Sequence, residues 1–263
     1  MTETGRARAG FADVGYDEAM RRARALVPVL RERAGRAELG RQMAAETLDD
    51  LHRTGLFRFH QPRRWGGMEL DFVALFDVPA EIARGCASTG WNVANLGVHH
   101  WMLALYDERA QDEVWSKNPD ALIASGIAYP QGSGRRVDGG FVVSGFWNFS
   151  SGVDACDWNM LAVVVKDGER VVDHRMCLVP KSDYEIVDDW NVLGMRSTGS
   201  KSVRAKDVFV PEHRALSMYL ARGGRQFPGA RVSDNPLYHV PLAALGSHCL
   251  AGAGVGNAQA AVE

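Results

Sequence analysis

Apolar residues in the first half of the chain recur with a period close to that of an α-helix. Within Tyr16–Arg36, Met20, Ala23 and Leu26 are three residues apart and would lie on one face of a helix. Similar spacing predicts further helices over residues 48–56, 72–84, 89–106 and 109–116. The first part of the chain is therefore predicted to be entirely helical.

From about residue 120 the pattern changes to short runs rich in Val, Ile and aromatic residues, separated by turn residues. In one run Val142, Ser144 and Phe146 occupy alternate positions, which is the period of a strand. This pattern predicts an antiparallel sandwich or barrel over residues 120–211. A helical pattern returns from about Tyr238, so the fold class is α+β in the order α, β, α.

These changes of pattern suggest five segments. We expect a flexible tail, an N-terminal helical domain, a central β domain, a loop, and the first part of a C-terminal helical domain, at residues 1–15, 16–119, 120–215, 216–236 and 237–263. The sequence stops in the predicted last helix without a capping signal, which suggests that the rest of that domain is absent.

Composition narrows the classes of protein. The chain of 263 residues is 46% hydrophobic and has a net charge of −2, which is typical of a globular protein and argues against nucleic-acid binding. No apolar run approaches the ~20 residues that a membrane span needs, and the N-terminus lacks the apolar core of a secretion signal. We therefore expect a cytoplasmic protein without a membrane partner. The four cysteines are scattered and suggest neither a disulfide framework nor a metal site.

The catalytic motifs that spacing alone can identify are absent, including a dinucleotide-binding glycine motif, a P-loop and a nucleophile elbow. His99 and His100 are adjacent on a predicted helix, so they point about 100° apart and are poorly placed to hold one metal ion. We predict no metal site.

Two stretches could carry chemistry. Residues 145–158, GFWNFSSGVDACDW, join aromatic rings to hydroxyls and a glycine at a predicted strand end. Such groups suit a planar ring that forms hydrogen bonds, but they also suit a β-sandwich core that ends in a turn. Residues 190–200, WNVLGMRSTGS, suit an anion contact or an ordinary loop.

Taken together, GLFRFHQPRRWGG, ASTGWN, LGVHHW, DGGFVVSGFWNFSSG and WNVLGMRSTGS resemble the acyl-CoA dehydrogenase superfamily. The likeness is greater to its two-component flavin monooxygenases, the oxygenase components that hydroxylate phenols such as 4-hydroxyphenylacetate or the secosteroid phenol of cholesterol breakdown. It runs from about Tyr16 to the end of the chain. GIAYPQGSG and WNFSSG replace the T-E-P-x-x-G-S-D and W-I-T-N of the dehydrogenases, which favours the oxygenase branch.

The resemblance implies a flavin site and a catalytic group. The flavin contacts that it implies are Trp91, Ser125, Gly126, Ile127, Asn148, Phe149, Ser150 and, with a weaker match, Arg196 near the cofactor or a subunit contact. The implied catalytic residues are His99 and Ser125, which would bind the phenol, and Ser150, which would donate a hydrogen bond near flavin N5.

The resemblance also implies cofactors and partners. A separate reductase would supply reduced flavin, FMNH2 or FADH2, and O2 would form a C4a-hydroperoxyflavin that attacks the aromatic substrate. The full-length family forms homotetramers through a C-terminal helical bundle, which this sequence would lack. Two alternatives stay open: an acyl-CoA dehydrogenase-like FAD oxidoreductase, and a truncated non-catalytic subunit that needs a partner chain.

Overall fold

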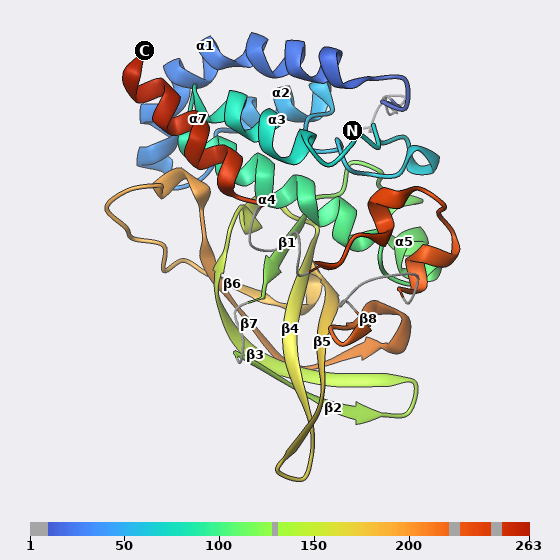
Figure 1. The fold of residues 1–263 in the computed structure, drawn as a ribbon. Coiled ribbons are helices and arrows are strands. Elements are labelled where there is room, and N and C mark those ends of the chain that lie inside the picture. The colour runs from blue at the N-terminus through green and yellow to red at the C-terminus, as the bar shows by residue number, and fades with distance from the viewer. Residues whose placement is uncertain (1–9, 128–130, 221–226, 243–248) are drawn as a thin grey trace, which may run out of the picture.

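Helices form one end of the molecule and a β-sheet the other (Figure 1). The computed structural model describes residues 10–127, 131–220, 227–242 and 249–263. The predicted order of helices, strands and a further helix is confirmed in these residues. Parts of the predicted tail (1–15), loop (216–236) and last helix (237–263) lie outside them.

The main helices are α1 (Tyr16–Gly40), α2 (Ala45–Thr54), α3 (Ala74–Ala83), α4 (Ala87–Leu103), α5 (Glu108–Trp115) and α7 (Ala251–Val262). Helix α1 continues through Pro28, although proline removes a backbone donor from the helix interior. Helix α2 ends at Gly55, whose left-handed φ of 74° closes the helix. Helix α4 is buried along almost its whole length, because it packs against α3, α7 and the first strand.

The strands are β1 (Ile123–Gly126), β2 (Gly132–Val137), β3 (Gly140–Ser150), β4 (Trp158–Asp167), β5 (Arg170–Pro180), β6 (Glu185–Val187), β7 (Lys201–Pro211) and β8 (Ala215–Ser217). They form one sheet in the order β6-β7-β3-β2-β4-β5-β8, with β1 beside β4. Most pairings are antiparallel, as predicted, but β4 pairs in parallel with both β1 and β2. Alternation along single strands does not reveal these two pairings, because it says nothing about which strands are neighbours.

Helix α7 packs closely on α3 because it carries glycines where the two helices meet (Figure 1). A Cβ on Gly252 would lie 2.1 Å from the carbonyl oxygen of Phe76, and one on Gly256 would lie 1.9 Å from that of Ala80. These distances are far below van der Waals contact, so the contact requires glycine at both positions.

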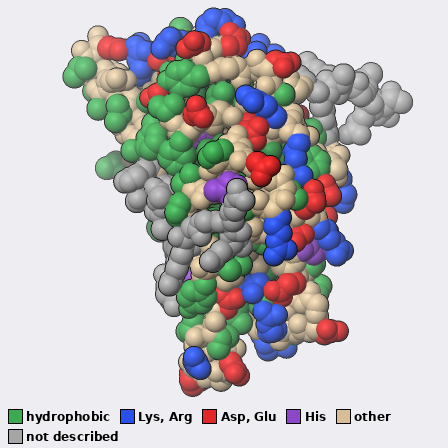
Figure 2. Space-filling model, turned by 45° about the vertical axis from the view of Figure 1, so that its right-hand side comes forward, with side chains coloured by type: hydrophobic (Ala, Val, Ile, Leu, Met, Phe, Trp, Pro, Cys, Tyr) green, Lys and Arg blue, Asp and Glu red, His purple; other side chains and the backbone are tan. Residues whose placement is uncertain are grey.

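The core runs from the helices into the sheet and includes the buried indoles of Trp101, Trp115 and Trp147. At this junction the buried guanidinium of Arg58 donates to Asp120, 2.7 Å away, which ties the helical part to the start of the sheet. The surface is different, since Figure 2 shows acidic and basic side chains mixed over the face that it presents. None of the helices described here is both long and apolar enough to span a membrane.

Candidate functional site

A pocket of about 420 Å³ lies where helix α4, the first strand and the end of β3 meet the loop before β7. Its volume is within the range of small-molecule sites. The residues that line it are Trp91, Asn95, Ser125, Ile127, Asn148, Phe149, Ser151, Trp190, Val192, Gly194, Met195, Thr198, Ser200 and Leu250. The pocket therefore brings together five of the predicted site residues, which come from three separate parts of the chain.

Helix α4 presents Trp91 and Asn95 to this pocket. They are four residues apart, and His99 follows at the same spacing, so the three share one face of the helix. Asn95 was not predicted as a site residue, although its position between Trp91 and His99 could have identified it.

His99 is buried, and its Nδ1 lies 2.6 Å from the carbonyl oxygen of Ile123. Because a carbonyl oxygen only accepts, Nδ1 carries the proton, and Nε2 of the neutral ring is left as an acceptor. Burial lowers the pKa of His99 to about 4, although the hydrogen bond to Ile123 opposes the shift. The ring is therefore neutral near pH 7 and less basic than an ordinary histidine.

Serine hydroxyls connect Trp91 to the loop before β7. The Nε1–H of Trp91 donates to the Oγ of Ser151 at 3.2 Å, and that oxygen is 2.7 Å from the Oγ of Ser200. Ser200 in turn lies 2.7 Å from the Oγ1 of Thr198. The chain of hydroxyls fixes the indole plane and supplies polar groups along the same wall of the pocket.

At the two strand ends, some side chains face the pocket and others face the sheet interior. Ser125 and Ile127 line the pocket, whereas a Cβ on Gly126 would lie 2.6 Å from the Cβ of Trp147, so this position faces the indole. At the end of β3, Asn148, Phe149 and Ser151 line the pocket.

Ser150, between Phe149 and Ser151, is fully buried and is not among the residues that line the pocket. Its Oγ accepts a hydrogen bond of 2.8 Å from the side chain of Asn159 in β4. Three consecutive residues were predicted to face the flavin at each strand end. In the first triplet the pleat of the strand turns Gly126 the other way, whereas in the second the left-handed Phe149 and a shift of register between Trp147 and Ser150 interrupt the alternation, so that Asn148 and Phe149 line the pocket and Ser150 does not.

Phe149 and Asn148 are held in place by different contacts. Phe149 has a left-handed φ of 65°, is 63% exposed, and meets the ring of Trp190 edge to face at 6.1 Å. The side-chain oxygen of Asn148 accepts from Ser202 at 3.0 Å, and its backbone N–H donates to Gln131 at 3.2 Å. A non-glycine residue at positive φ is unusual, and here it turns an aromatic ring toward the pocket.

Arg196 is not among the residues that line the pocket, in contrast to its neighbours Met195 and Thr198. Its backbone N–H donates to Glu38 at 3.1 Å. Its side-chain Nε is buried and has no hydrogen-bond partner among the described residues. The weaker match of Arg196 to the family pattern agrees with this position outside the pocket wall.

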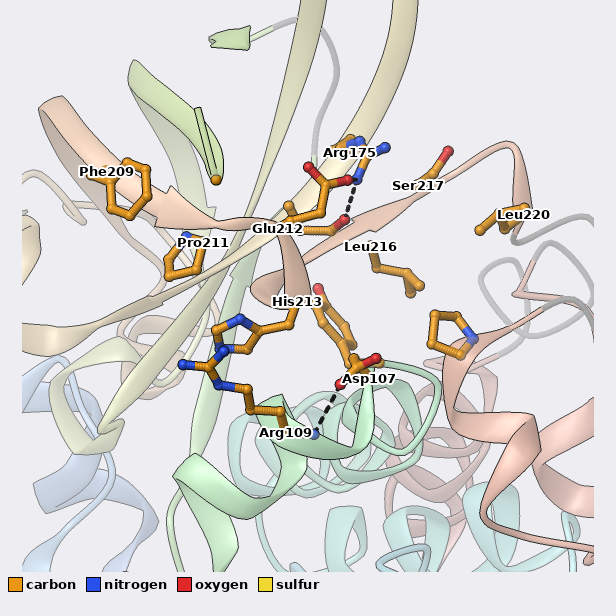
Figure 3. A pocket seen from close by; sticks show the side chains of 14 residues that line it. Asp107, Arg109, Arg175, Phe209, Pro211, Glu212, His213, Leu216, Ser217 and Leu220 are labelled. Carbon is orange, nitrogen blue, oxygen red and sulfur yellow. Dashed lines mark hydrogen bonds and ion pairs between the residues drawn. The ribbon is translucent and has the colours of Figure 1, made fainter. Parts of the chain in front are cut away.

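A larger pocket of about 690 Å³ lies between α5 and the end of the sheet (Figure 3). Several of its charged groups already have partners: Arg175 lies 2.7 Å from Glu212, and Asp107 accepts the backbone N–H of Arg109 at 3.0 Å. His213 contacts Glu113 at 3.0 Å. Because these groups are already satisfied, this pocket has less to offer a polar ligand than the smaller one.

The smaller pocket has the properties that an isoalloxazine ring needs. Indole and phenyl faces of Trp91, Phe149 and Trp190 can contact a planar ring, and the hydroxyls of Ser125 and Ser151 can bind its polar edge. The residues present therefore fit a flavin. Among the described residues, no group of three or more His, Cys, Asp or Glu side chains could hold a metal ion.

The known proteins that this chain resembles include flavin-dependent enzymes. Residues 18–117 match the family model "Acyl-CoA dehydrogenase, N-terminal domain". The oxygenase subunit HsaA of a flavin-dependent monooxygenase from Rhodococcus jostii is 44% identical over 223 residues, which are 84% of this chain and 58% of that protein. The oxygenase component of an FADH2-dependent resorcinol hydroxylase from a Rhizobium species is 36% identical, over 89% of this chain and 57% of that protein.

Among solved structures, the HsaA monooxygenase from Mycobacterium tuberculosis superposes with a TM-score of 0.89 at 40% identity, covering 93% of this chain and 67% of that one. The chain spans little more than half the length of the curated relatives that it matches. It belongs to the acyl-CoA dehydrogenase superfamily, in the group formed by the oxygenase components of flavin-dependent monooxygenases.

Proposed function

We propose that this chain acts as the oxygenase component of a two-component flavin monooxygenase and hydroxylates an aromatic, phenolic small molecule. The observation that carries the proposal is the pocket between α4 and the strand ends, which joins aromatic faces to hydroxyls. His99 is buried one helical turn beyond Asn95 and is not itself among the residues that line this pocket. The names of the relatives support the same chemistry, since they include HsaA and a resorcinol hydroxylase.

In this proposal the flavin ring lies along Trp91, Ser125, Ile127, Asn148 and Phe149. The backbone at Gly126 and Ser150 contacts the ring, and Ser151 supplies the hydroxyl that the sequence assigned to Ser150. Arg196 acts through its backbone or in a subunit contact. Reduced flavin, as FMNH2 or FADH2, together with O2 would supply the oxidising chemistry when bound. The chain's own groups exclude water, orient the substrate and move its proton.

His99 and Ser125 are the proposed partners of the substrate hydroxyl. With Nδ1–H held by the carbonyl of Ile123, the neutral ring offers Nε2 as an acceptor for a phenol proton. Drawing that proton away makes the aromatic ring richer in electrons and more reactive toward an electrophile. We further propose a separate reductase as the source of reduced flavin, a homo-oligomeric assembly, and a cytoplasmic location.

The proposal is tested by mixing the chain with anaerobically reduced FMN or FAD, a simple phenol and ¹⁸O₂. We expect the phenol to gain one ¹⁸O atom, as measured by mass spectrometry, and to gain none when the flavin is added in its oxidised form. The variant His99→Gln is expected to bind flavin but to form much less product. Failure of both flavins to give labelled product from any phenol would contradict the proposed reaction.

A further inference from the structure

The last turn of α1 contacts both ends of the segment Asp188–Gly199, which we name the 188–199 loop. This loop includes the short 3-10 helix η4 (Arg196–Thr198) and leads into β7. It supplies Trp190, Val192, Gly194, Met195 and Thr198 to the wall of the smaller pocket. The end of α1 is thus connected to the pocket although it does not line it.

Glu38 forms the first of the two contacts. Its carboxylate accepts the backbone N–H groups of Arg196 and Ser197 at 3.1 and 3.2 Å, and the hydroxyl of Ser197 at 3.0 Å. Burial of this carboxylate acts to raise its pKa, but the hydrogen bonds from Ser197 and Ser88 outweigh burial and hold the pKa below its usual value. Glu38 therefore satisfies the first N–H groups of η4 as a capping carboxylate would.

The same carboxylate also accepts the hydroxyl of Ser88 at 3.0 Å. Ser88 lies in the first turn of α4, the helix that presents Trp91 and Asn95 to the pocket. One side chain therefore bridges two walls of the pocket, α4 on one side and the 188–199 loop on the other.

Arg41 forms the second contact, at the other end of the loop. Its guanidinium lies 2.6 Å from Asp188 and donates to the carbonyl oxygen of Trp190 and the side chain of Asn191, each at 3.3 Å. Arg41 caps α1 with a left-handed φ of 55°. Glycine is the usual residue at such a position, so an arginine here carries backbone strain that the helix end alone does not require.

We propose that Glu38 and Arg41 are positioning residues that hold the 188–199 loop against α4 and thereby set the affinity of the pocket for flavin. This inference rests on the proposed function. Neither residue lines the pocket, so both act through Trp190, Met195 and Thr198. Thr198 continues the connection, because its hydroxyl chain through Ser200 and Ser151 reaches the indole of Trp91.

The test uses Arg41→Gly, Glu38→Gln and a control, Glu46→Gln. Glycine relieves the strain at φ 55° but removes the guanidinium, so Arg41→Gly separates loop positioning from helix stability. Glutamine keeps the shape of Glu38 but replaces one carboxylate oxygen by an NH2 group. Because NH2 cannot accept a hydrogen bond, one of the backbone N–H groups of η4 loses its acceptor. Glu46 on α2 is exposed and forms an ion pair with Arg36 at 3.0 Å, away from the 188–199 loop.

Three quantities are measured for each variant: the Kd for reduced FMN and FAD, the thermal midpoint, and hydrogen exchange at the amides of Arg196 and Ser197 without flavin. We expect Glu38→Gln to raise the flavin Kd by tenfold or more, equivalent to about 1.4 kcal/mol, and to speed exchange at both amides. Arg41→Gly is expected to raise the Kd severalfold while the thermal midpoint stays constant or rises. Glu46→Gln should match the wild-type protein in flavin affinity and exchange.

Unchanged flavin affinity in both Arg41→Gly and Glu38→Gln would overturn the inference, as would faster exchange in Glu38→Gln without a change in Kd. A wild-type chain that binds neither flavin would overturn the proposed function and this inference with it. That failure is recognised separately because the wild-type titration is done first.

Discussion

Acidification from pH 7 to pH 5 is predicted to destabilise the fold, because histidines are buried in uncharged form. His60 and His99 are fully or almost fully buried, and burial lowers the pKa of each to about 4. His100 is also buried, and burial together with the charge on Arg58 lowers its pKa well below the ordinary value. In the unfolded chain all three would titrate near pH 6.5.

The sign of the effect follows from which state binds protons. Below pH 6.5 the unfolded chain takes up protons at these histidines, whereas the folded chain does not until about pH 4, so stability falls as the pH falls through this window. For a pKa that moves from 6.5 to about 4, the loss between pH 7 and 5 is about 2 kcal/mol for each histidine. His60 and His99 together would thus remove about 4 kcal/mol, a large part of a typical stability of 5–15 kcal/mol.

Urea unfolding followed by tryptophan fluorescence, at several values between pH 7.5 and 5, measures this loss. Carboxyl groups titrate mostly below this range, so the histidines dominate the slope. The variant His60→Leu should lose about 2 kcal/mol less stability than the wild-type protein over the same interval, because leucine does not titrate. We chose leucine because an apolar side chain suits the site between Phe59 and Phe72. Stability that is flat from pH 7 to 5, or a slope unchanged in His60→Leu, would refute the reasoning.

Two further predictions concern packing and the hydroxyl chain. Gly256→Ala should lower the thermal midpoint, because its Cβ would lie 1.9 Å from the carbonyl of Ala80, whereas Gly254→Ala, with open space around it, should hold or raise the midpoint. Equal effects in a thermal melt would contradict the packing of α7 on α3. Ser151→Ala should cost about 1 kcal/mol in urea unfolding, because the half-buried Nε1–H of Trp91 loses its acceptor. A cost near zero would mean that this hydrogen bond contributes little.

The fold class could be predicted from the sequence because its signals are local. The apolar spacing over 89–106 identified the helix that the structure shows at Ala87–Leu103, and the alternation around Val142 identified part of β3. Membership of the superfamily, also predicted, is confirmed by the matched family model and relatives. The parallel neighbours of β4 were missed, because pairing depends on how distant segments meet and not on the pattern within each strand.

Only part of the site could be predicted from the sequence, because some of its contacts depend on how distant segments pack together. Trp91, Ser125 and Phe149 do meet in one pocket, but Gly126 and Ser150 face the sheet interior. The pleat of a strand could have indicated this for Gly126, but not for Ser150, because the left-handed Phe149 and a register shift between Trp147 and Ser150 interrupt the alternation. Helical spacing from Trp91 and His99 could have added Asn95 in the same way. By contrast, no local pattern places Trp190 beside Phe149, since that contact depends on where the 188–199 loop packs.

We propose that flavin binds in the pocket beside α4 and not in the larger one beside α5. The most direct measurement is an anaerobic titration of reduced FMN and FAD into the wild-type chain, Asn95→Trp and Leu220→Trp, since Asn95 lines the first pocket and Leu220 the second. We predict binding to the wild-type protein, loss of binding in Asn95→Trp, and wild-type affinity in Leu220→Trp. Wild-type affinity in Asn95→Trp, or loss of binding in Leu220→Trp, would contradict the claim.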